Sequence, residues 1–342
     1  MTLEQTPAIN EVTKFFFDLT PDRILDAVES AGLHCTGRCL TLNSMENRVY
    51  EVEVDIDHNE AKTPSDNFRV VKFYRPGRWS EEQILEEHQF LFDLETAEIP
   101  VVAPIRFPDG TSLRRLGEIG IYFAVFPKRG GRTPDEVTED QAEWLGRLLA
   151  RLHIVGKQRK SEYRLSLTSE TYGRKNLEFL LQHNFVPTQM RGTYETIVLE
   201  ICSLSDAIMK GVPTQRVHGD CHLGNIVWGS SGPAFIDFDD MVNAPPVQDL
   251  WLLCPAQDSW GKSILEATIS GYEQLADFPR STLRLIEPLR ALRMVHFTTW
   301  IAKRWDDPAF KRVFDRFGTP GYWNEQLQNI REQLQLIQEL TD

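Results

Sequence analysis

The feature that most constrains this chain of 342 residues is a short, strongly polar run between apolar, strand-like segments. The run reads His218-Gly219-Asp220-Cys221-His222-Leu223-Gly224-Asn225, and a second one reads Phe235-Ile236-Asp237-Phe238-Asp239. The stretch from Val217 to Asp240 predicts short strands within a part of the chain whose other periodicity is helical. The sequence therefore predicts a small β insertion that brings two carboxylates and one carboxamide together.

These residue types and their spacing suit phosphoryl transfer. That reaction needs an acceptor hydroxyl held in line and a divalent metal that neutralises charge on the phosphates. A carboxylate can take the hydroxyl proton, and an amide oxygen with a second carboxylate can hold Mg²⁺ through hard oxygen ligands. Asp220 and Asn225 are separated by four residues, and Asp237 follows a dozen residues later, which is the spacing of a kinase catalytic loop and its metal-binding aspartate.

Plainer interpretations of the same residues stay open. Asp220 and Asn225 are both common turn residues. His218 fits a packed histidine that orders the loop better than it fits a chemical participant. Asp239 and Asp240 are expected to be solvated or to lie behind the metal ligands.

The rest of the chain predicts two unlike parts. A strand-rich N-terminal part over residues 1–126 is followed by a Gly- and Pro-containing hinge over 127–134 and a mainly helical part over 135–342. The fold class expected is therefore α+β, with two lobes. Helices are expected at about 21–31, 80–96, 141–155, 193–210 and 287–305, a hairpin of strands at 48–54 and 68–74, and a further strand at 121–126.

Lys72 lies on the second strand of the predicted hairpin, where a lone lysine most often faces solvent. A kinase site instead needs a strand lysine on the α- and β-phosphates, held by a helix glutamate. A capping box at Ser80 starts the following helix. At 100° per residue, Glu87 falls on the apolar side of this helix and Glu86 falls on the polar side, so we expect Glu87 to contact Lys72 and Glu86 to be solvated.

Neither G-x-G-x-x-G nor G-x-x-x-x-G-K-[ST] occurs in the sequence. The polar turn that ends at Asn47 contains Ser44, whose hydroxyl and neighbouring backbone N–H groups are suited to cover phosphates without glycine. An ordinary polar turn into the strand fits the same residues.

Charge and cysteine usage argue against nucleic-acid binding, membrane binding, disulfides and a zinc site. With 37 Lys plus Arg against 50 Asp plus Glu, the net charge is −13, which disfavours binding to nucleic acid and to anionic membranes. No segment approaches the roughly 20 apolar residues of a membrane span. The five cysteines are odd in number and scattered, so free thiols in the cytoplasm are expected in place of disulfides or zinc.

The chain resembles the aminoglycoside/choline-phosphotransferase branch of the protein-kinase-like superfamily, and within it a family of bacterial Ser/Thr protein kinases that act in stress responses. The likeness spans roughly residues 40–300. The segments that carry it are Leu42 to Tyr50, Val71 to Pro76, Ile84 to Phe90, Phe123 to Pro127, Leu145 to His153, His218 to Asn225, Val247 to Trp251 and Ile286 to Ala291.

The resemblance implies ATP and Mg²⁺ as cofactors and a role for each matching residue. Asp220 is then the proton acceptor, Asn225 and Asp237 bind Mg²⁺ (Asp237 being counted among the catalytic residues), and Ser44 and Lys72 contact ATP. Adenine lies against the hinge at Phe126 to Lys128. Asp249 corresponds to a helix aspartate that supports the catalytic loop, although a carboxylate at a helix N-terminus accounts for it almost as well.

The sequence departs from the pattern of eukaryotic kinases at three points. It has His-Gly-Asp where they have His-Arg-Asp, and Asp-Phe-Asp where they have Asp-Phe-Gly, and no Ala-Pro-Glu segment follows. Activation-loop switching is therefore not expected. Three functions stay open, namely a Ser/Thr protein kinase acting as a monomer on a protein substrate, a kinase of amino-alcohols or antibiotics, and a pseudokinase that only binds nucleotide.

Overall fold

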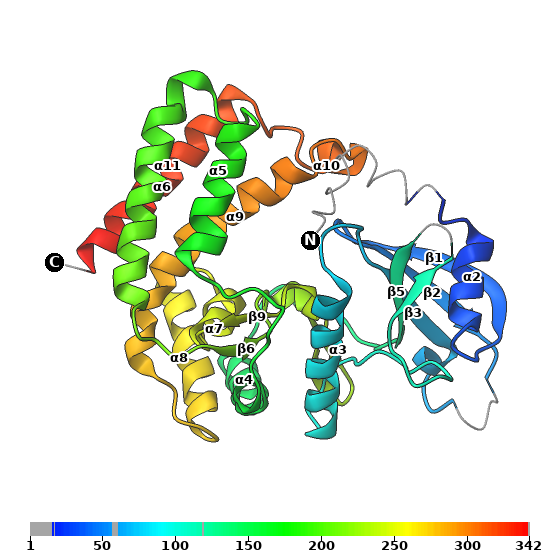
Figure 1. The fold of residues 1–342 in the computed structure, drawn as a ribbon. Coiled ribbons are helices and arrows are strands. Elements are labelled where there is room, and N and C mark those ends of the chain that lie inside the picture. Colours follow the sequence, from blue (N-terminus) through cyan, green and yellow to red (C-terminus); the bar gives the residue numbers. More distant parts are fainter. Residues whose placement is uncertain (1–15, 17, 57–60, 118–119, 341–342) are drawn as a thin grey trace.

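The computed structural model describes residues 16, 18–56, 61–117 and 120–340, which form two unlike parts (Figure 1). This is the kinase-like fold expected from the sequence, with a strand-rich N-terminal part and a mainly helical C-terminal part. None of the helices in the described ranges combines the length and the apolar character that a bilayer-spanning segment requires.

The N-terminal part, here called the N-lobe, is built on one antiparallel sheet. Its strands lie in the order β1-β2-β3-β5-β4. Helix α2, Pro21–Glu29, packs on the sheet through Ile24, Ala27 and Val28. The strands are β1 Cys35–Leu42, β2 Arg48–Val54, β3 Phe68–Phe73, β4 Arg114–Leu116 and β5 Ile121–Pro127.

The predicted hairpin is confirmed, since β2 and β3 pair antiparallel with Val49 opposite Lys72. The sequence missed β1, which precedes this hairpin and makes the turn containing Ser44 a β1–β2 connection. The register between β1 and β2 shifts between Cys35 and Cys39, so the two-residue alternation that announces a strand is broken there.

Helix α3, Glu81–Thr96, connects the sheet to the other part of the molecule. Ser80 and Gln83 form the predicted capping box, in which Ser80 Oγ accepts from the Gln83 N–H and Gln83 Oε1 accepts from the Ser80 N–H. The buried side of α3, which includes Ile84, Phe90 and Leu94, belongs to the hydrophobic core of the C-terminal part. The glutamates of this helix are thus placed at the junction of the two lobes.

The C-terminal part, here called the C-lobe, is a set of helices around two small β ladders. Helix α4 packs along α8, while α6, α9 and α11 pack on one another. The helices are α4 Glu139–Gln158, α5 Lys175–Gln182, α6 Thr188–Met209, α7 Val247–Leu253, α8 Ser259–Glu273, α9 Ile286–Lys303, α10 Pro308–Val313 and α11 Pro320–Glu339. The predicted helices at 141–155, 193–210 and 287–305 correspond to α4, α6 and α9.

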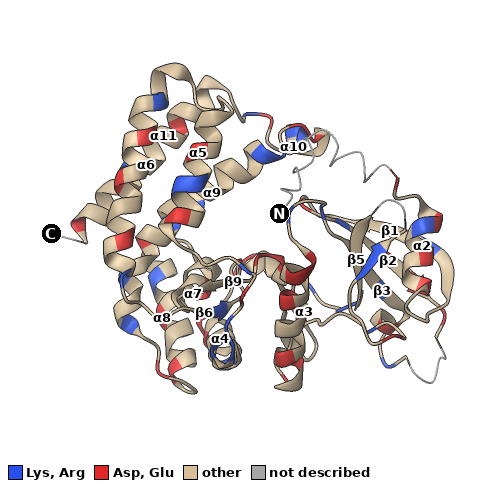
Figure 2. Cartoon of the chain, in the orientation of Figure 1, with Lys and Arg blue, Asp and Glu red and all other residues tan. Residues whose placement is uncertain are grey.

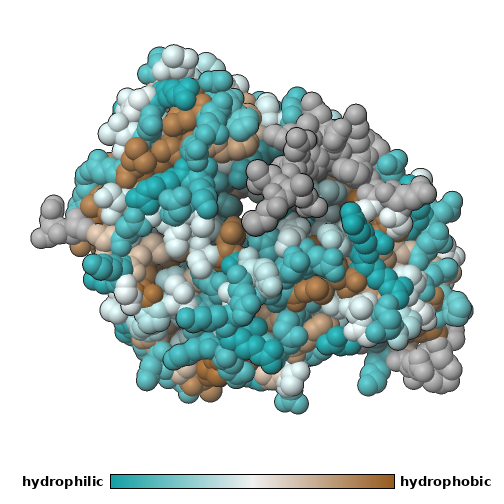
Figure 3. Space-filling view, in the orientation of Figure 1, coloured by the Kyte–Doolittle hydropathy of each residue, from teal (hydrophilic) through white to brown (hydrophobic). Residues whose placement is uncertain are grey.

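The predicted β insertion consists of four short strands. β6, Gln215–Val217, pairs with β9, Val242–Ala244, and β7, Ile226–Gly229, forms a hairpin with β8, Gly232–Phe235. Charged residues of both signs are spread along both lobes (Figure 2). The face seen in Figure 3 is mainly hydrophilic.

Candidate active site

The loop from His218 to Asn225 connects β6 to β7 and is held by Asp249 of α7. The two carboxylate oxygens of Asp249 accept the backbone N–H groups of His218 and Gly219, each at 2.9 Å. His153 Nε2 lies 3.0 Å from the same carboxylate. Asp249 is fully buried, so these contacts support the loop directly, as the resemblance implied.

Two residues of this loop are fixed by tight packing. His218 is buried, and its Nε2 lies 2.9 Å from the carbonyl oxygen of Ile236, which agrees with a packed histidine that orders the loop. Gly219 has φ +86°, and a Cβ atom at this position would lie 2.1 Å from the carbonyl oxygen of Asp240. No other residue type fits there without displacing the backbone at Asp240.

Asp220 projects into a cavity between the lobes and is paired with an arginine that the sequence did not reveal. Its Oδ1 accepts from Arg293 Nη2 of α9 at 2.6 Å, and its Oδ2 lies 3.5 Å from His222 Nε2. Burial raises the pKa of this carboxyl group, but the hydrogen bond from His222 and the charge of Arg293 outweigh burial and bring the pKa below its ordinary value. The residue is therefore held as a carboxylate.

Asn225 and Asp237 flank the β7–β8 hairpin. Asn225 immediately precedes β7, Asp237 follows shortly after β8, and the Ile236 N–H donates to the Asn225 carbonyl oxygen at 3.0 Å. Asn225 Nδ2 donates to the backbone oxygen of Asp220, which leaves the Asn225 side-chain oxygen available. Asp237 has a left-handed backbone, φ +58°, and its carboxylate is 53% exposed.

These oxygens fit a hard divalent cation. In the described part of the chain, no three His, Cys, Asp or Glu side chains gather as a complete metal cluster. Mg²⁺ does not need such a cluster, because it usually takes one or two protein carboxylates together with phosphate oxygens and water. A carboxylate and an amide oxygen beside a nucleotide site match that preference.

Lys72 of β3 is buried and contacts three carboxylates. Its Nζ lies 3.8 Å from Glu87 Oε1, so the predicted contact is confirmed. Asp239 is closer, at 2.9 Å, and Asp237 lies at 3.2 Å. Burial alone lowers the pKa of Lys72, but the three carboxylates raise it well above its ordinary value. The ammonium group is thus locked in the charged form.

Asp239 was expected to be solvated or to lie behind the metal ligands, and the structure excludes the solvated position, because its side chain is only 5% exposed. Its Oδ1 pairs with Lys72 and its Oδ2 pairs with Arg78 Nη1 at 2.7 Å. Asp240 also pairs with Arg78. The Asp-Phe-Asp sequence therefore supplies a buried anion where the eukaryotic pattern has glycine.

Glu86 and Glu87 of α3 have partners that the helical wheel does not reveal. Glu87 makes its shortest ion pair, 2.7 Å, with Arg164 of the segment between α4 and α5. Glu86 is not simply solvated as expected, because its carboxylate accepts the backbone N–H groups of Tyr163 and Arg164 at 3.0 and 2.7 Å. Both glutamates therefore connect α3 to the C-lobe.

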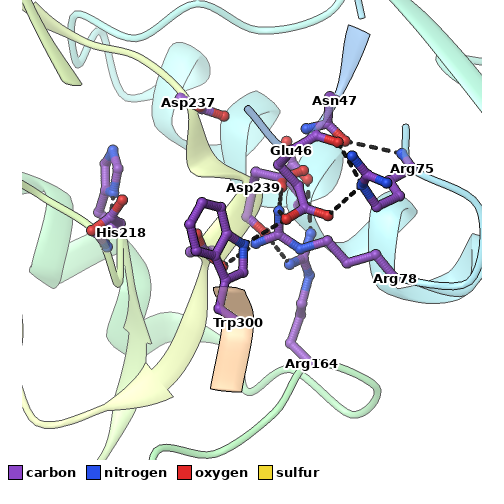
Figure 4. A network of polar contacts seen from close by, with 12 residues as sticks. Glu46, Asn47, Arg75, Arg78, Arg164, His218, Asp237, Asp239 and Trp300 are labelled. Atoms are coloured by element: carbon purple, nitrogen blue, oxygen red, sulfur yellow. Dashed lines mark hydrogen bonds and ion pairs between the residues drawn. The ribbon is translucent and has the colours of Figure 1, made fainter. Parts of the chain in front are cut away.

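A charged network around Glu46 lines part of the cavity (Figure 4). Glu46 of the β1–β2 turn is buried and accepts a hydrogen bond from Trp300 Nε1 at 2.6 Å. It also pairs with Arg304 at 2.7 Å, Arg75 at 3.2 Å and Arg78 at 3.3 Å. Because Trp300 and Arg304 belong to the C-lobe, Glu46 ties the turn of the N-lobe to it.

The hinge residues also line the cavity. The Phe126 ring packs edge-on against His88 at 6.2 Å. Lys128 Nζ pairs with Glu51 at 2.6 Å and lies 4.5 Å from the centre of the Phe68 ring. The side chain of Lys128 is therefore directed to the N-lobe sheet.

One cavity of about 720 Å³ receives every site residue predicted from the sequence. This volume lies in the usual range for small-molecule and cofactor sites. The predicted residues along its wall are Ser44, Lys72, Glu87, Phe126, Lys128, Asp220, Asn225 and Asp237. Arg78, Asp239 and Arg293 line the same cavity and were not predicted.

Such a cavity between a five-stranded sheet and a helical lobe, with a buried strand lysine and acidic loops, defines a kinase-like phosphotransferase. The chain belongs to the phosphotransferase enzyme family named APH, whose model matches residues 41–286.

The chain is also similar to individual proteins of known name. The chain is 38% identical to stress response kinase A of Escherichia coli K12 over 325 residues, which cover 95% of each protein. It is 36% identical, over 97% of each protein, to the serine/threonine protein kinase RdoA of Salmonella typhimurium. Among solved structures, the amicoumacin kinase hAmiN in complex with AMP-PNP, Ca²⁺ and Ami is similar with a TM-score of 0.71 and 19% identity, over 94% of this chain and 96% of that one.

Proposed function

We propose that the chain is a Ser/Thr protein kinase that transfers a phosphoryl group from ATP to a protein hydroxyl with Mg²⁺. The observation that carries the proposal is the single cavity that gathers a buried lysine, two acidic loops and the hinge between the lobes. We assign residues 1–126 to the N-lobe, 127–134 to the hinge and 135–342 to the C-lobe.

Each residue has a role in this proposal. Asp220 accepts the proton of the incoming hydroxyl through Oδ2, since Oδ1 is held by Arg293. Asn225 and Asp237 hold Mg²⁺ through their side-chain oxygens, and the ion neutralises charge on the phosphates when bound. Lys72 neutralises the α- and β-phosphates, and Glu87 supports Lys72.

The remaining residues hold the nucleotide. The hinge from Phe126 to Lys128 lies against adenine, because these residues line the cavity while the Lys128 side chain is drawn to Glu51. Ser44 and the N–H groups of the β1–β2 turn cover the phosphates. Glu46 holds that turn against the C-lobe.

A protein acceptor is favoured over a cationic small molecule by the pairing of charges in the cavity. An ammonium group on an acceptor needs a free carboxylate, and each carboxylate that lines this cavity already has an arginine or lysine partner within 4 Å. These pairs are Glu46 with Arg304, Glu51 with Lys128, Glu87 with Arg164, Asp220 with Arg293, Asp237 with Lys72, and Asp239 and Asp240 with Arg78. The names of the relatives also support a protein substrate.

The same relatives support a role in a bacterial stress response. We place the protein in the cytoplasm, since its five cysteines are free, as is usual in a reducing compartment. We take a monomer as the working state, which a measurement of mass in solution tests.

The experiment is to incubate the purified protein with Mg²⁺ and γ-labelled ATP, once with generic protein substrates and once with a panel of amino-alcohols. We expect label on Ser or Thr of protein, and a loss of at least about a hundredfold in turnover for Asp220→Ala. Asp277→Ala, which removes an exposed carboxylate outside the cavity, is the matched control and keeps full turnover.

The alternatives give other results. Label only on amino-alcohols supports a small-molecule kinase, and nucleotide binding without any transfer supports a pseudokinase. Near-normal turnover of Asp220→Ala contradicts the role given to that residue.

A further inference from the structure

One face of α9 forms a wall of the cavity. Residues three, four, seven and eleven positions apart share one side of a helix. On this helix they are Arg293, His296, Phe297, Trp300 and Arg304, here called the α9 stripe, and the first four line the cavity.

Both ends of the α9 stripe are engaged by other parts of the site. At one end Arg293 holds Asp220 Oδ1 at 2.6 Å. At the other end Trp300 and Arg304 hold Glu46 of the N-lobe. The α9 stripe therefore runs from the proposed proton acceptor to the turn that covers the nucleotide.

Phe297 lies between Arg293 and Trp300 on α9 and, unlike them, has no polar group in its side chain. Its side chain is 45% exposed, although it lines the cavity. Trp300 stacks on it with 5.5 Å between ring centres, and Phe314 meets it edge-on at 5.9 Å. The ring is thus packed against two aromatic rings, while nearly half of it is exposed in the cavity that Asp220 also lines.

The spacing along α9 matches an extended peptide. Arg293 and Phe297 are four residues apart, which is about 6 Å along a helix. An extended chain advances about 3.3 Å per residue and places side chains i and i+2 on one side. An acceptor side chain at Asp220 therefore has its second neighbour on the same side at the level of Phe297.

We propose that the α9 stripe is the surface that recognises the acceptor, and that Phe297 takes an apolar side chain two positions from the Ser or Thr that is phosphorylated. The proposal rests on the protein kinase function given above and adds the sequence class of the substrate. The occupant is an extended, hydroxyl-bearing peptide segment without a required basic residue, because the carboxylates along the cavity are already paired.

The test uses matched Ser peptides that carry Leu, Gly, Lys or Glu at the second position before or after the serine. We expect the full-length protein to favour Leu on one of the two sides by about fivefold to tenfold in kcat/KM, the scale of burying the exposed part of one aromatic ring. Phe297→Ser is expected to lose this preference while its KM for ATP is unchanged, and Phe297→Leu is expected to keep most of it.

Leu199→Ser is the matched control, because Leu199 is 44% exposed on α6 and does not line the cavity. Equal rates for all peptides with the wild-type protein, or a preference that survives in Phe297→Ser, overturn the inference and leave the kinase function standing. A wild-type protein that labels amino-alcohols and no peptide overturns the protein kinase function, and this inference with it. If Phe297→Ser does not fold, Phe297→Ala takes its place, and a preference for Leu that survives in Phe297→Ala overturns the inference.

Discussion

Asp239→Asn removes the carboxylate that lies closest to Lys72 and keeps the size of the side chain. In the native structure Asp239 Oδ1 is 2.9 Å from Lys72 Nζ, and Oδ2 is 2.7 Å from Arg78 Nη1. The asparagine has one oxygen and one N–H donor in place of two anionic oxygens, so at most one of the two cations keeps a neutral acceptor.

The cost is set by burial. Breaking a buried ion pair by removing one partner typically costs about 3–5 kcal/mol, because a charge stays buried without compensation. Here Lys72 retains Asp237 and Glu87, while Arg78 retains Glu46 and Asp240. We therefore expect the lower end, a loss of about 3 kcal/mol in the free energy of unfolding.

The effect on catalysis appears in kcat. Loss of the Asp239 charge raises the positive potential around Lys72, which strengthens attraction to ATP. The same change removes a contact that fixes the position of the Lys72 ammonium group. These effects oppose each other in nucleotide affinity, whereas misplacement of about 1 Å alone can cost up to a hundredfold in rate. We expect kcat to fall about tenfold to hundredfold, with a smaller change in the dissociation constant of ATP.

Glu87→Gln is the comparison variant, because Glu87 lies 3.8 Å from Lys72 and makes its shorter pair with Arg164. Single-turnover kinetics give the rate, isothermal titration calorimetry gives nucleotide affinity, and urea unfolding gives stability. Both variants are expected to lose stability, so only kcat separates them. A larger loss of kcat in Glu87→Gln than in Asp239→Asn refutes the view that Asp239 is the main support of Lys72.

Two further predictions concern stability. Burial, followed by the charges of Lys72 and Arg164, lowers the pKa of His88 to about 3 from its ordinary 6.5, so the unfolded chain binds the extra proton. The contribution of neutral His88 to the free energy of unfolding is therefore fully present above pH 6.5, and it falls by up to about 1.4 kcal/mol per pH unit below that pH. Urea unfolding between pH 5 and 7 should show a flatter pH dependence for His88→Gln than for the wild-type protein. Glu46→Gln leaves buried arginines short of one charge and should cost about 3 kcal/mol, whereas Glu53→Gln, which breaks the exposed pair with Arg38, should cost less than about 1 kcal/mol. Equal losses for the two glutamates would contradict the role of burial.

The sequence predicted those parts of the fold and of the candidate site that local patterns encode. The capping box at Ser80 fixed the start of α3, and the angular position of Glu87 on that helix indicated its burial and its contact with Lys72. The spacing of Asp220, Asn225 and Asp237 predicted that they share one cavity, since the β7–β8 hairpin between them is short.

The residues that escaped prediction act over long sequence distances. Arg293 lies 73 positions from Asp220, and nothing in its neighbourhood differs from an ordinary helical arginine. Arg164, which pairs with Glu87, lies in a connecting segment without periodicity. Asp239 was expected to be solvated or to lie behind the metal ligands, and its pairs with Lys72 and Arg78 were not predicted, because a sequence pattern does not show which charges meet between two lobes.

Helix α9 joins the two ends of the cavity mechanically. Arg293 and Arg304 are eleven residues apart, roughly 16 Å along a helix axis, and the first grips the proposed proton acceptor while the second grips the N-lobe turn. Glu46 of the N-lobe contacts the same helix that carries Arg293, so a change in the distance between the lobes acts first on the contacts of Glu46 with Trp300 and Arg304. The pair between Arg293 and Asp220 lies within the C-lobe and does not depend on that distance.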